Sequence, residues 1–156
     1  MHEKVKKFIN NYFIELFLIG SALILFFLML YKMPIFDGDT FYYIAKAKKM
    51  LTTGDWLNTS SLMAKPVLGI WMMAFTYKLF GVSIFTTYLW HSLFGLGSLM
   101  ILYFFLKEFG SRISAQVGTA VLLTSLMFFY QTCSPMLDIP MIFLLLLSHW
   151  FLFKYI

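Results

Sequence analysis

Cysteine and charged residues are scarce in this sequence. Cys133 is the only cysteine, so the chain has no internal disulfide and no cysteine cluster that could hold a metal. Charged residues make up 12% of the 156 residues, whereas 61% are hydrophobic and 21% are aromatic. A chain this short cannot bury so much apolar surface in a core of its own. The composition therefore excludes an ordinary water-soluble domain and indicates a membrane protein.

The sequence also lacks a continuous basic face with stacking aromatic residues, although its formal net charge is +5. Its lysines stand beside apolar segments, as membrane-flanking residues do, which excludes a nucleic-acid-binding surface. No internal repeat, low-complexity tract or flexible Gly/Ser linker divides the chain, so we predict a single membrane domain over 1–156. No small-x-small cleavage site closes the first apolar run, which indicates an uncleaved first helix.

Hydrophobic residues are gathered in runs of bilayer-crossing length, roughly 20 residues each. These runs predict about four transmembrane helices, at about 12–30, 84–106, 113–130 and 139–153. The loop 32–82 between the first two spans predicts two further helices, at 39–51 and 66–80. Both are too short or too charged to span, so we expect them to lie at the membrane interface. The expected fold class is an all-α integral membrane protein.

Basic residues flank the predicted spans on one side, where an alternating chain brings together Lys4, Lys6, Lys7, Lys107, Arg112 and Lys154. Positively charged flanks favour the cytoplasmic side, although Lys46, Lys48 and Lys49 in the long loop argue the other way. We predict a multi-pass protein of the cell (inner) membrane with the loop 32–82 outside the cytoplasm. Asp39 and Asp138 then share the outer side, where the two carboxylates can meet.

The loop and the segment before the fourth span carry a series of ordered motifs. In chain order these are Asp39, Tyr43, Ala47, Met50 and Leu51; Gly54, Asp55 and Trp56; Lys65 and Pro66; Leu79, Phe80 and Gly81; and Ser134 to Pro140. Their order and spacing, from about Phe36 to Pro140, resemble the protein O-mannosyltransferase and aminoarabinose transferase superfamily. These enzymes are membrane glycosyltransferases of the GT-C fold, similar to glycosyltransferase family 39. The sequence departs from the family pattern at Thr40, Val67 and Tyr88, where Glu, Pro and Arg are usual.

The resemblance implies a membrane glycosyltransferase that moves a sugar from a polyprenyl-phosphate donor, of dolichyl or undecaprenyl type, to a lipid, glycan or protein acceptor. The expected partners are therefore this donor, the acceptor and the lipid bilayer. The resemblance also implies that Asp39 is the catalytic base. Asp138 would position the acceptor or, in members that use one, help bind a divalent metal. Substrate binding would involve Lys65, Tyr43 and Asp37, with the register of Tyr43 favouring Asp39 over Asp37 as the motif residue.

The chemistry of sugar transfer suits these residue types. A base that takes the proton of the acceptor contributes roughly 10²–10⁴ in rate, and a carboxylate can supply it. A cation is needed to meet the charge that develops on the departing lipid phosphate, and Lys65 at the start of an interfacial helix is placed for that. No organic cofactor is indicated. Two carboxylates without a nearby histidine are a thin ligand set, so metal binding stays open.

Structural explanations stand beside each of these assignments. Asp39 and Asp138 could cap helices, Lys65 could be a lysine reaching to the headgroups, and His91 is expected to form an interhelical hydrogen bond. GT-C enzymes have many more spans, so we expect the chain to be the N-terminal portion of a longer protein. Two alternatives remain: an inactive truncated glycosyltransferase, or a non-enzymatic membrane protein such as a transporter component or assembly subunit. Polar residues are concentrated in the outer loops, which favours the enzyme.

Overall fold

The computed structural model describes residues 11–29, 38–57 and 67–156. Its regular elements are α2 (Phe13–Met29), α3 (Gly38–Thr53), α4 (Leu68–Phe80), α5 (Ile84–Phe109), α6 (Arg112–Thr124), α7 (Leu126–Thr132) and α8 (Asp138–Tyr155). The described ranges contain no β-strand. The predicted all-α class is therefore confirmed.

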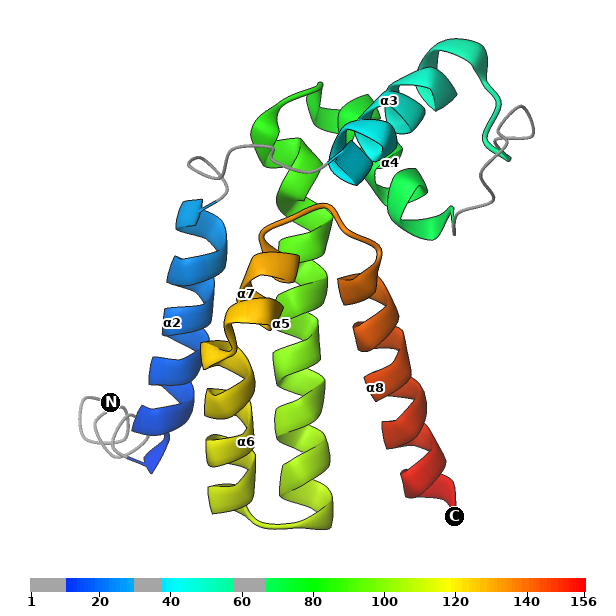
Figure 1. Cartoon of the computed structure of the whole chain (residues 1–156). Coiled ribbons are helices and arrows are strands. Elements are labelled where there is room, and N and C mark those ends of the chain that lie inside the picture. The colour runs from blue at the N-terminus through cyan, green and yellow to red at the C-terminus, as the bar shows by residue number, and fades with distance from the viewer. Residues whose placement is uncertain (1–10, 30–37, 58–66) are drawn as a thin grey trace, which may run out of the picture.

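The long helix α5 is the centre of a helical bundle. Figure 1 shows α2, α6 and α8 running alongside it, while α3 and α4 form a separate pair at one end of the bundle. The buried hydrophobic core of the bundle consists of Ala22, Phe26, Leu99, Leu123, Phe128, Cys133 and Ile139. Within it, the rings of Phe26 and Phe128 meet edge to face, with their centroids 6.2 Å apart. The start of α2, the α5–α6 turn and the end of α8 lie together at the end opposite α3 and α4 (Figure 1).

The lengths of the described helices agree with a membrane protein. Two of them, α5 and α8, are long and apolar enough to cross a bilayer, and α6 with α7 would make a third span if the pair is one unit. The apolar helix α2 is shorter, and the predicted first span ends at residue 30, outside the described residues. The apolar helix α4 is shorter still, as expected for an interfacial segment.

The predicted third span over 113–130 is not one straight helix. It is broken at Ser125, whose backbone is extended (φ −65°, ψ 116°), and α6 and α7 meet at an angle of 68°. Before the break, the hydroxyl of Thr124 donates to the carbonyl oxygen of Ala120 over 2.8 Å. Serine and threonine hydroxyls that bond to their own helix backbone favour bends of this kind. Composition alone predicted the apolar run but not the break.

The helices α3 and α4 pack against each other through a second hydrophobic core. Its buried residues are Tyr43, Ala47 and Met50 from α3, and Ile70, Met73, Ala74 and Tyr77 from α4. Phe41 and Ala45 lie outside this core and are exposed, so they take no part in the contact with α4. The sequence offers two overlapping apolar stripes on α3, and contact with α4 selects one of them.

Hydrogen bonds fasten α4 to the start of α5. Gly81 ends α4 with a positive φ of 79°, and Ser83 begins α5 in a reciprocal capping arrangement with Thr86. Across the junction, Thr76 donates to the carbonyl oxygen of Thr86 over 3.0 Å, and the hydroxyls of Tyr77 and Thr87 lie 2.7 Å apart. Burial raises the pKa of Tyr77, so its phenol stays protonated. The α3–α4 pair is thereby held at one end of α5.

Two local expectations about these helices need correction. The helix expected to begin at Pro66 begins at Leu68, with Val67 before it, and Pro66 itself lies outside the described residues. The histidine expected to bond between helices, His91, is fully buried in α5, yet neither ring nitrogen reaches a partner on another described helix.

Candidate acidic functional site

The first acidic residue, Asp39, lies in the first turn of α3. Residues spaced by three or four positions share one face of a helix, so Asp39 continues the stripe formed by Tyr43, Ala47 and Met50. Those three residues are buried against α4. The motif spacing that suggests the family is therefore also the packing face of α3, and this face carries Asp39 to the edge of the α3–α4 pair.

The second acidic residue, Asp138, reaches the same place because the α7–α8 connection packs on α4. Met136 and Leu137 contact the second hydrophobic core, next to α3 and α4. Gly69 permits this approach, since a Cβ atom built on it would lie 2.8 Å from Cδ2 of Leu137. A side chain at position 69 would force the Leu137 side chain, directly before Asp138, to shift.

A groove of about 700 Å³ joins the two acidic residues. We call it the acidic groove, and its lining residues are Asp39, Tyr43, Leu68, Gly69, Met136, Leu137, Asp138, Pro140, Met141, Leu144, Leu145 and Ser148. The carboxylates of Asp39 and Asp138 form part of its polar lining. One wall is a stripe of α8 at helical spacing, formed by Met141, Leu144, Leu145 and Ser148. The groove thus combines an acidic part with an apolar wall along a membrane-crossing helix.

Both carboxylates are exposed, although they line a groove. Asp138 has no hydrogen bond or ion pair with any residue in the described part of the chain. It follows Leu137, which is the N-cap of α8, so Asp138 is not the capping residue. The first turn of a helix nevertheless favours a negative charge. The side chain is therefore placed where a ligand can reach it.

The remaining predicted substrate residues fall into two groups. Tyr43 lines the acidic groove and is only 3% exposed, with its ring edge-on to that of Tyr42 at 5.8 Å. Asp37 and Lys65 lie outside the described residues. The sequence singled out neither Gly69 nor the groove stripe of α8, and it placed Leu137 in the motif Ser134 to Pro140 without indicating its contact with Gly69. Most of the α8 stripe stands in the apolar run 139–147, where no change of polarity marks one face.

The part of the chain that the structure describes offers a limited donor set for a metal. No group of three or more His, Cys, Asp or Glu side chains comes together there. The acidic groove contributes the carboxylates of Asp39 and Asp138. A divalent cation bound between them would need further oxygen ligands from water or substrate.

The Gly-Asp-Trp motif after α3 has a structural function. Gly54 adopts a positive φ of 72°, and its amide donates to the carbonyl oxygen of Met50, which ends the helix. The indole nitrogen of Trp71 on α4 then donates to the carbonyl oxygen of Trp56 over 2.6 Å. These contacts turn the chain after α3 and hold it against α4.

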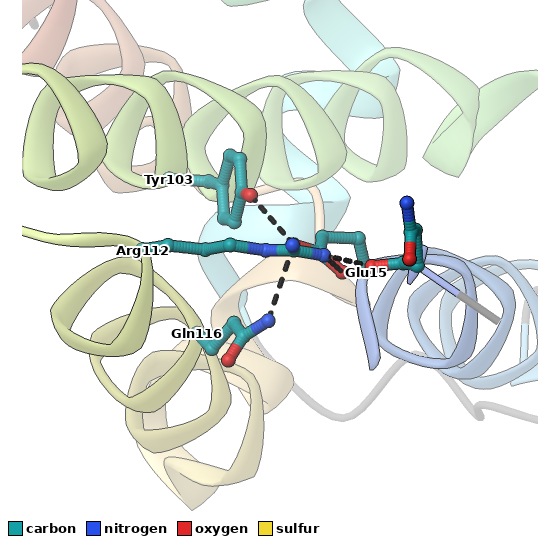
Figure 2. Close-up of polar contacts among 5 residues, drawn as sticks. Glu15, Tyr103, Arg112 and Gln116 are labelled. Atoms are coloured by element: carbon teal, nitrogen blue, oxygen red, sulfur yellow. Dashed lines mark hydrogen bonds and ion pairs between the residues drawn. The ribbon is translucent and has the colours of Figure 1, made fainter. Parts of the chain in front are cut away.

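A second polar cluster lies at the opposite end of the bundle (Figure 2). The carboxylate of Glu15 on α2 accepts hydrogen bonds from Nε of Arg112 at 2.6 Å, the hydroxyl of Tyr103 at 2.9 Å and Nε2 of Gln116 at 3.1 Å. These partners come from α5 and α6, so the cluster ties three helices together. In the sequence, Glu15 stands near the start of the first apolar run and Arg112 among the basic flanks, and nothing there indicates that the two side chains pair.

The fold and the groove define an all-α membrane protein with an acidic site at one end of its bundle. Residues 64–156 match the sequence model of the family described as dolichyl-phosphate-mannose-protein mannosyltransferase. The match covers more than half of the chain, and the chain belongs to this family.

Two relatives extend the comparison. An undecaprenyl phosphate-alpha-4-amino-4-deoxy-L-arabinose arabinosyl transferase of Shewanella sediminis is 31% identical over 109 residues, which are 64% of this chain and 20% of that protein. An uncharacterized protein of Aquifex aeolicus is 26% identical over 139 residues, which are 86% of this chain and 28% of that protein. The chain thus spans less than a third of the length of either relative. No solved structure matches it.

Proposed function

We propose that this chain forms the acidic groove of a membrane glycosyltransferase that transfers a sugar from a polyprenyl-phosphate carrier to a lipid, glycan or protein acceptor. The observation that carries the proposal is the acidic groove itself, in which Asp39 and Asp138 stand beside an apolar wall of α8. A polyprenyl-phosphate sugar has the matching parts, namely a polar sugar and a long apolar chain. Family membership supports the same reaction class.

The polyprenyl chain would lie along α8 and continue into the bilayer. From Pro140 to Ser148 the wall extends about 12 Å at the rise of an α-helix. Only 11% of the apolar window of α8 is buried inside the protein, so most of this helix is open to lipid. A chain on this wall would hold its phosphate and sugar near the carboxylates.

The proposed reaction is a displacement at the anomeric carbon. Asp39 accepts the proton of the acceptor group, whose freed electron pair forms the new bond to the anomeric carbon. The bond from that carbon to the phosphate oxygen breaks, and polyprenyl phosphate departs with the electron pair. Asp138 would position the acceptor, and Tyr43 and Asp37 would contact substrate. The ammonium group of Lys65 would stabilise the negative charge that develops on the departing phosphate.

The names of the related proteins support the donor class without selecting a sugar. The family description names dolichyl phosphate with mannose, and the Shewanella relative is named for undecaprenyl phosphate with aminoarabinose. Each name pairs a polyprenyl phosphate with one sugar. We therefore assign the carrier class to this chain and leave the sugar and the acceptor to experiment.

We place the acidic groove on the outer face of the cell (inner) membrane. The end of the bundle opposite the groove carries Lys107, Arg112 and Lys154, at the α5–α6 turn and the end of α8. Basic flanks favour the cytoplasmic side. In a Cys133→Ser chain, labelling of single cysteines introduced at Asp55 and at Lys154 with a membrane-impermeant thiol reagent tests this orientation, and we expect labelling from outside at position 55 only.

The test of function is sugar transfer from a radiolabelled mixture of polyprenyl-phosphate sugars in membranes that contain this chain. We expect transfer by the unaltered chain, loss in Asp39→Asn, and a strong decrease in Leu144→Trp, which fills the groove along α8. Phe153→Trp is the matched control, because Phe153 is exposed on the same helix but faces away from the groove stripe. It should transfer normally.

Each outcome has a clear meaning. Transfer that Asp39→Asn and Leu144→Trp abolish but Phe153→Trp retains would support the groove as the active site. A well-inserted chain that transfers nothing would contradict activity of these 156 residues. In that case, binding of a photoreactive polyprenyl phosphate distinguishes the alternatives. Labelling of the α8 wall indicates an inactive glycosyltransferase, and its absence indicates a non-enzymatic membrane protein.

A further inference from the structure

A second groove lies between α2 and α5, at the end of the bundle away from the acidic groove. Its volume is about 230 Å³, and its lining residues are Tyr12, Glu15, Leu18, Ile19, Ala22, Leu96, Leu99, Met100, Tyr103, Phe104, Lys107 and Thr119. Its two limits on this side are Tyr12, directly before α2, and Ala22 on α2, about 15 Å apart along the helix axis. A space this long with so small a volume is narrow, and it suits one hydrocarbon chain.

The two limits of this α2–α5 groove differ in polarity. Ala22 and Leu96 lie at the limit nearer the middle of the bundle, where the lining is apolar. Tyr12, Tyr103 and Lys107 lie at the other limit, close to the ends of the helices. Tyrosine and lysine side chains at a helix end are typical of the headgroup level of a bilayer. The groove is therefore oriented like a lipid, with its polar end at the membrane surface.

The charge at the polar end is positive. Glu15 also lines the groove, but its carboxylate is paired with Arg112. Glu108 accepts from the indole nitrogen of Trp150 over 2.7 Å and is thus directed toward α8. The ammonium group of Lys107 lies over the ring of Tyr103, 5.8 Å from its centroid, and pairs with no carboxylate among the described residues. It is available to a negatively charged headgroup.

A polar group inside the groove points independently to a ligand. Thr119 on α6 is 6% exposed and lines the groove, yet its hydroxyl has no hydrogen-bond partner among the described residues. A buried hydroxyl without a partner is costly, and most such groups are satisfied in native proteins. The ester carbonyl of a phospholipid chain would supply an acceptor at this position.

We propose that the α2–α5 groove binds one acyl chain of an anionic phospholipid, with Lys107 at the phosphate and Thr119 donating to an ester carbonyl. The site is separate from the acidic groove and does not depend on the proposed glycosyltransferase activity. The bound lipid fills the space between α2 and α5 and covers the Thr119 hydroxyl. Its chemical class is that of phosphatidylglycerol, a phospholipid with one negative charge.

The probe is phosphatidylglycerol with a photoreactive acyl chain, added to the full chain in nanodiscs and mapped by mass spectrometry. We expect one adduct per chain, on groove residues of α2 and α5, which unlabelled phosphatidylglycerol displaces better than phosphatidylcholine. Ile19→Trp should abolish the adduct by filling the groove. Lys107→Gln should lower the preference for phosphatidylglycerol about fivefold, the effect of one basic residue near a headgroup.

Matched controls separate the groove from general lipid contact. Ile24→Trp places the same indole on α2 at an exposed residue outside the groove, and Lys154→Gln removes a lysine at the end of α8. Thr119→Val should weaken labelling, whereas Thr124→Val should not, because the Thr124 hydroxyl already bonds to its own helix. The polar variants add no volume and keep the test valid if Ile19→Trp is poorly folded.

Other results would overturn the proposal. Labelling spread evenly over α2 and α8, and unchanged by both Ile19→Trp and Ile24→Trp, would mean that only bulk lipid contacts the protein. If Lys107→Gln and Lys154→Gln lower the preference for phosphatidylglycerol equally, Lys107 is not the residue that binds the phosphate. An Ile19→Cys variant that forms a disulfide-linked dimer, without lipid labelling at the groove, would show that a second copy of the chain occupies the space.

Discussion

Glu15 and Asp138 are both carboxylates in the first turn of a membrane helix, yet their surroundings differ. Glu15 accepts hydrogen bonds from three side chains on two other helices, and one donor is the guanidinium group of Arg112. Asp138 is exposed in the acidic groove and has no partner among the described residues. The comparison teaches that the same chemical group can join helices where its partners surround it, and can serve a ligand where they do not.

The largest expected difference between the two ends concerns catalysis. Asp39→Asn should lower the rate of sugar transfer by about 10²–10⁴, because the amide cannot accept the proton of the acceptor. Glu15→Gln should leave the rate per folded molecule unchanged. Initial rates, normalised to the amount of folded protein in the membrane, measure both. A rate that falls equally in the two variants would break the distinction between a reactive end and a structural end.

The next effect concerns the contact between Gly69 and Leu137, the residue directly before Asp138. Gly69→Val should lower the rate of transfer roughly tenfold to a hundredfold, since the new side chain displaces Leu137 and a shift of about 1 Å in a site can cost as much. Gly20→Val is the control, because a Cβ atom at Gly20 meets nothing within 4 Å. Initial rates and thermal unfolding are measured for both. Equal rates in the two variants would show that the Gly69–Leu137 contact does not position the site.

A smaller effect is expected on stability at the Glu15 end. Glu15→Gln should lower the free energy of unfolding by about 1–2 kcal/mol, because the ion pair with Arg112 is lost. The loss stays this small because the Arg112 side chain is partly exposed and water solvates its charge. This corresponds to a decrease in Tm of about 2–8 °C for a chain of this size. Thermal unfolding in detergent measures it. An unchanged Tm would mean that the cluster does not hold α2 to α5 and α6.

The smallest effect is expected at Asp138. Asp138→Asn should change the free energy of unfolding by less than about 1 kcal/mol, because the only stabilisation it removes is that of a charge near a helix N-terminus. The same unfolding assay compares it directly with Glu15→Gln. If Asp138→Asn proves the more destabilising change, Asp138 has a structural partner and its assignment to the acceptor fails.

Much of the architecture could be predicted because it depends on local patterns. The apolar runs around α5 and α8 identify membrane helices by composition and length, and both are long enough to span. The helices α3 and α4 were predicted from a mixed pattern and a short apolar run, and their observed bounds differ by about two residues. The break at Ser125 was not predicted, since neither glycine nor proline marks it.

The candidate site could be predicted only in part. Asp39 and Asp138 stand out in the sequence because acidic residues are rare in this chain and accompany recognisable motifs. The approach of Leu137 to Gly69 and the groove stripe of α8 could not be inferred, because no pattern along the chain relates Leu137 to Gly69 or marks one face of the apolar run of α8. The α3 stripe of Tyr43, Ala47 and Met50 illustrates the limit, because its spacing is visible in the sequence whereas its packing against α4 is visible only in the structure.

The sequence by itself determined that this chain belongs in a bilayer, that it is helical, and which acidic residues are candidates for chemistry. Hydropathy, helical period and motif spacing are properties of neighbouring residues, so they can be read along the chain. Only the tertiary structure decided that Glu15 meets Arg112, that α3 buries one of two apolar stripes, and that Leu137 rests on Gly69. These contacts join residues far apart in the sequence, and their geometry depends on how whole helices pack.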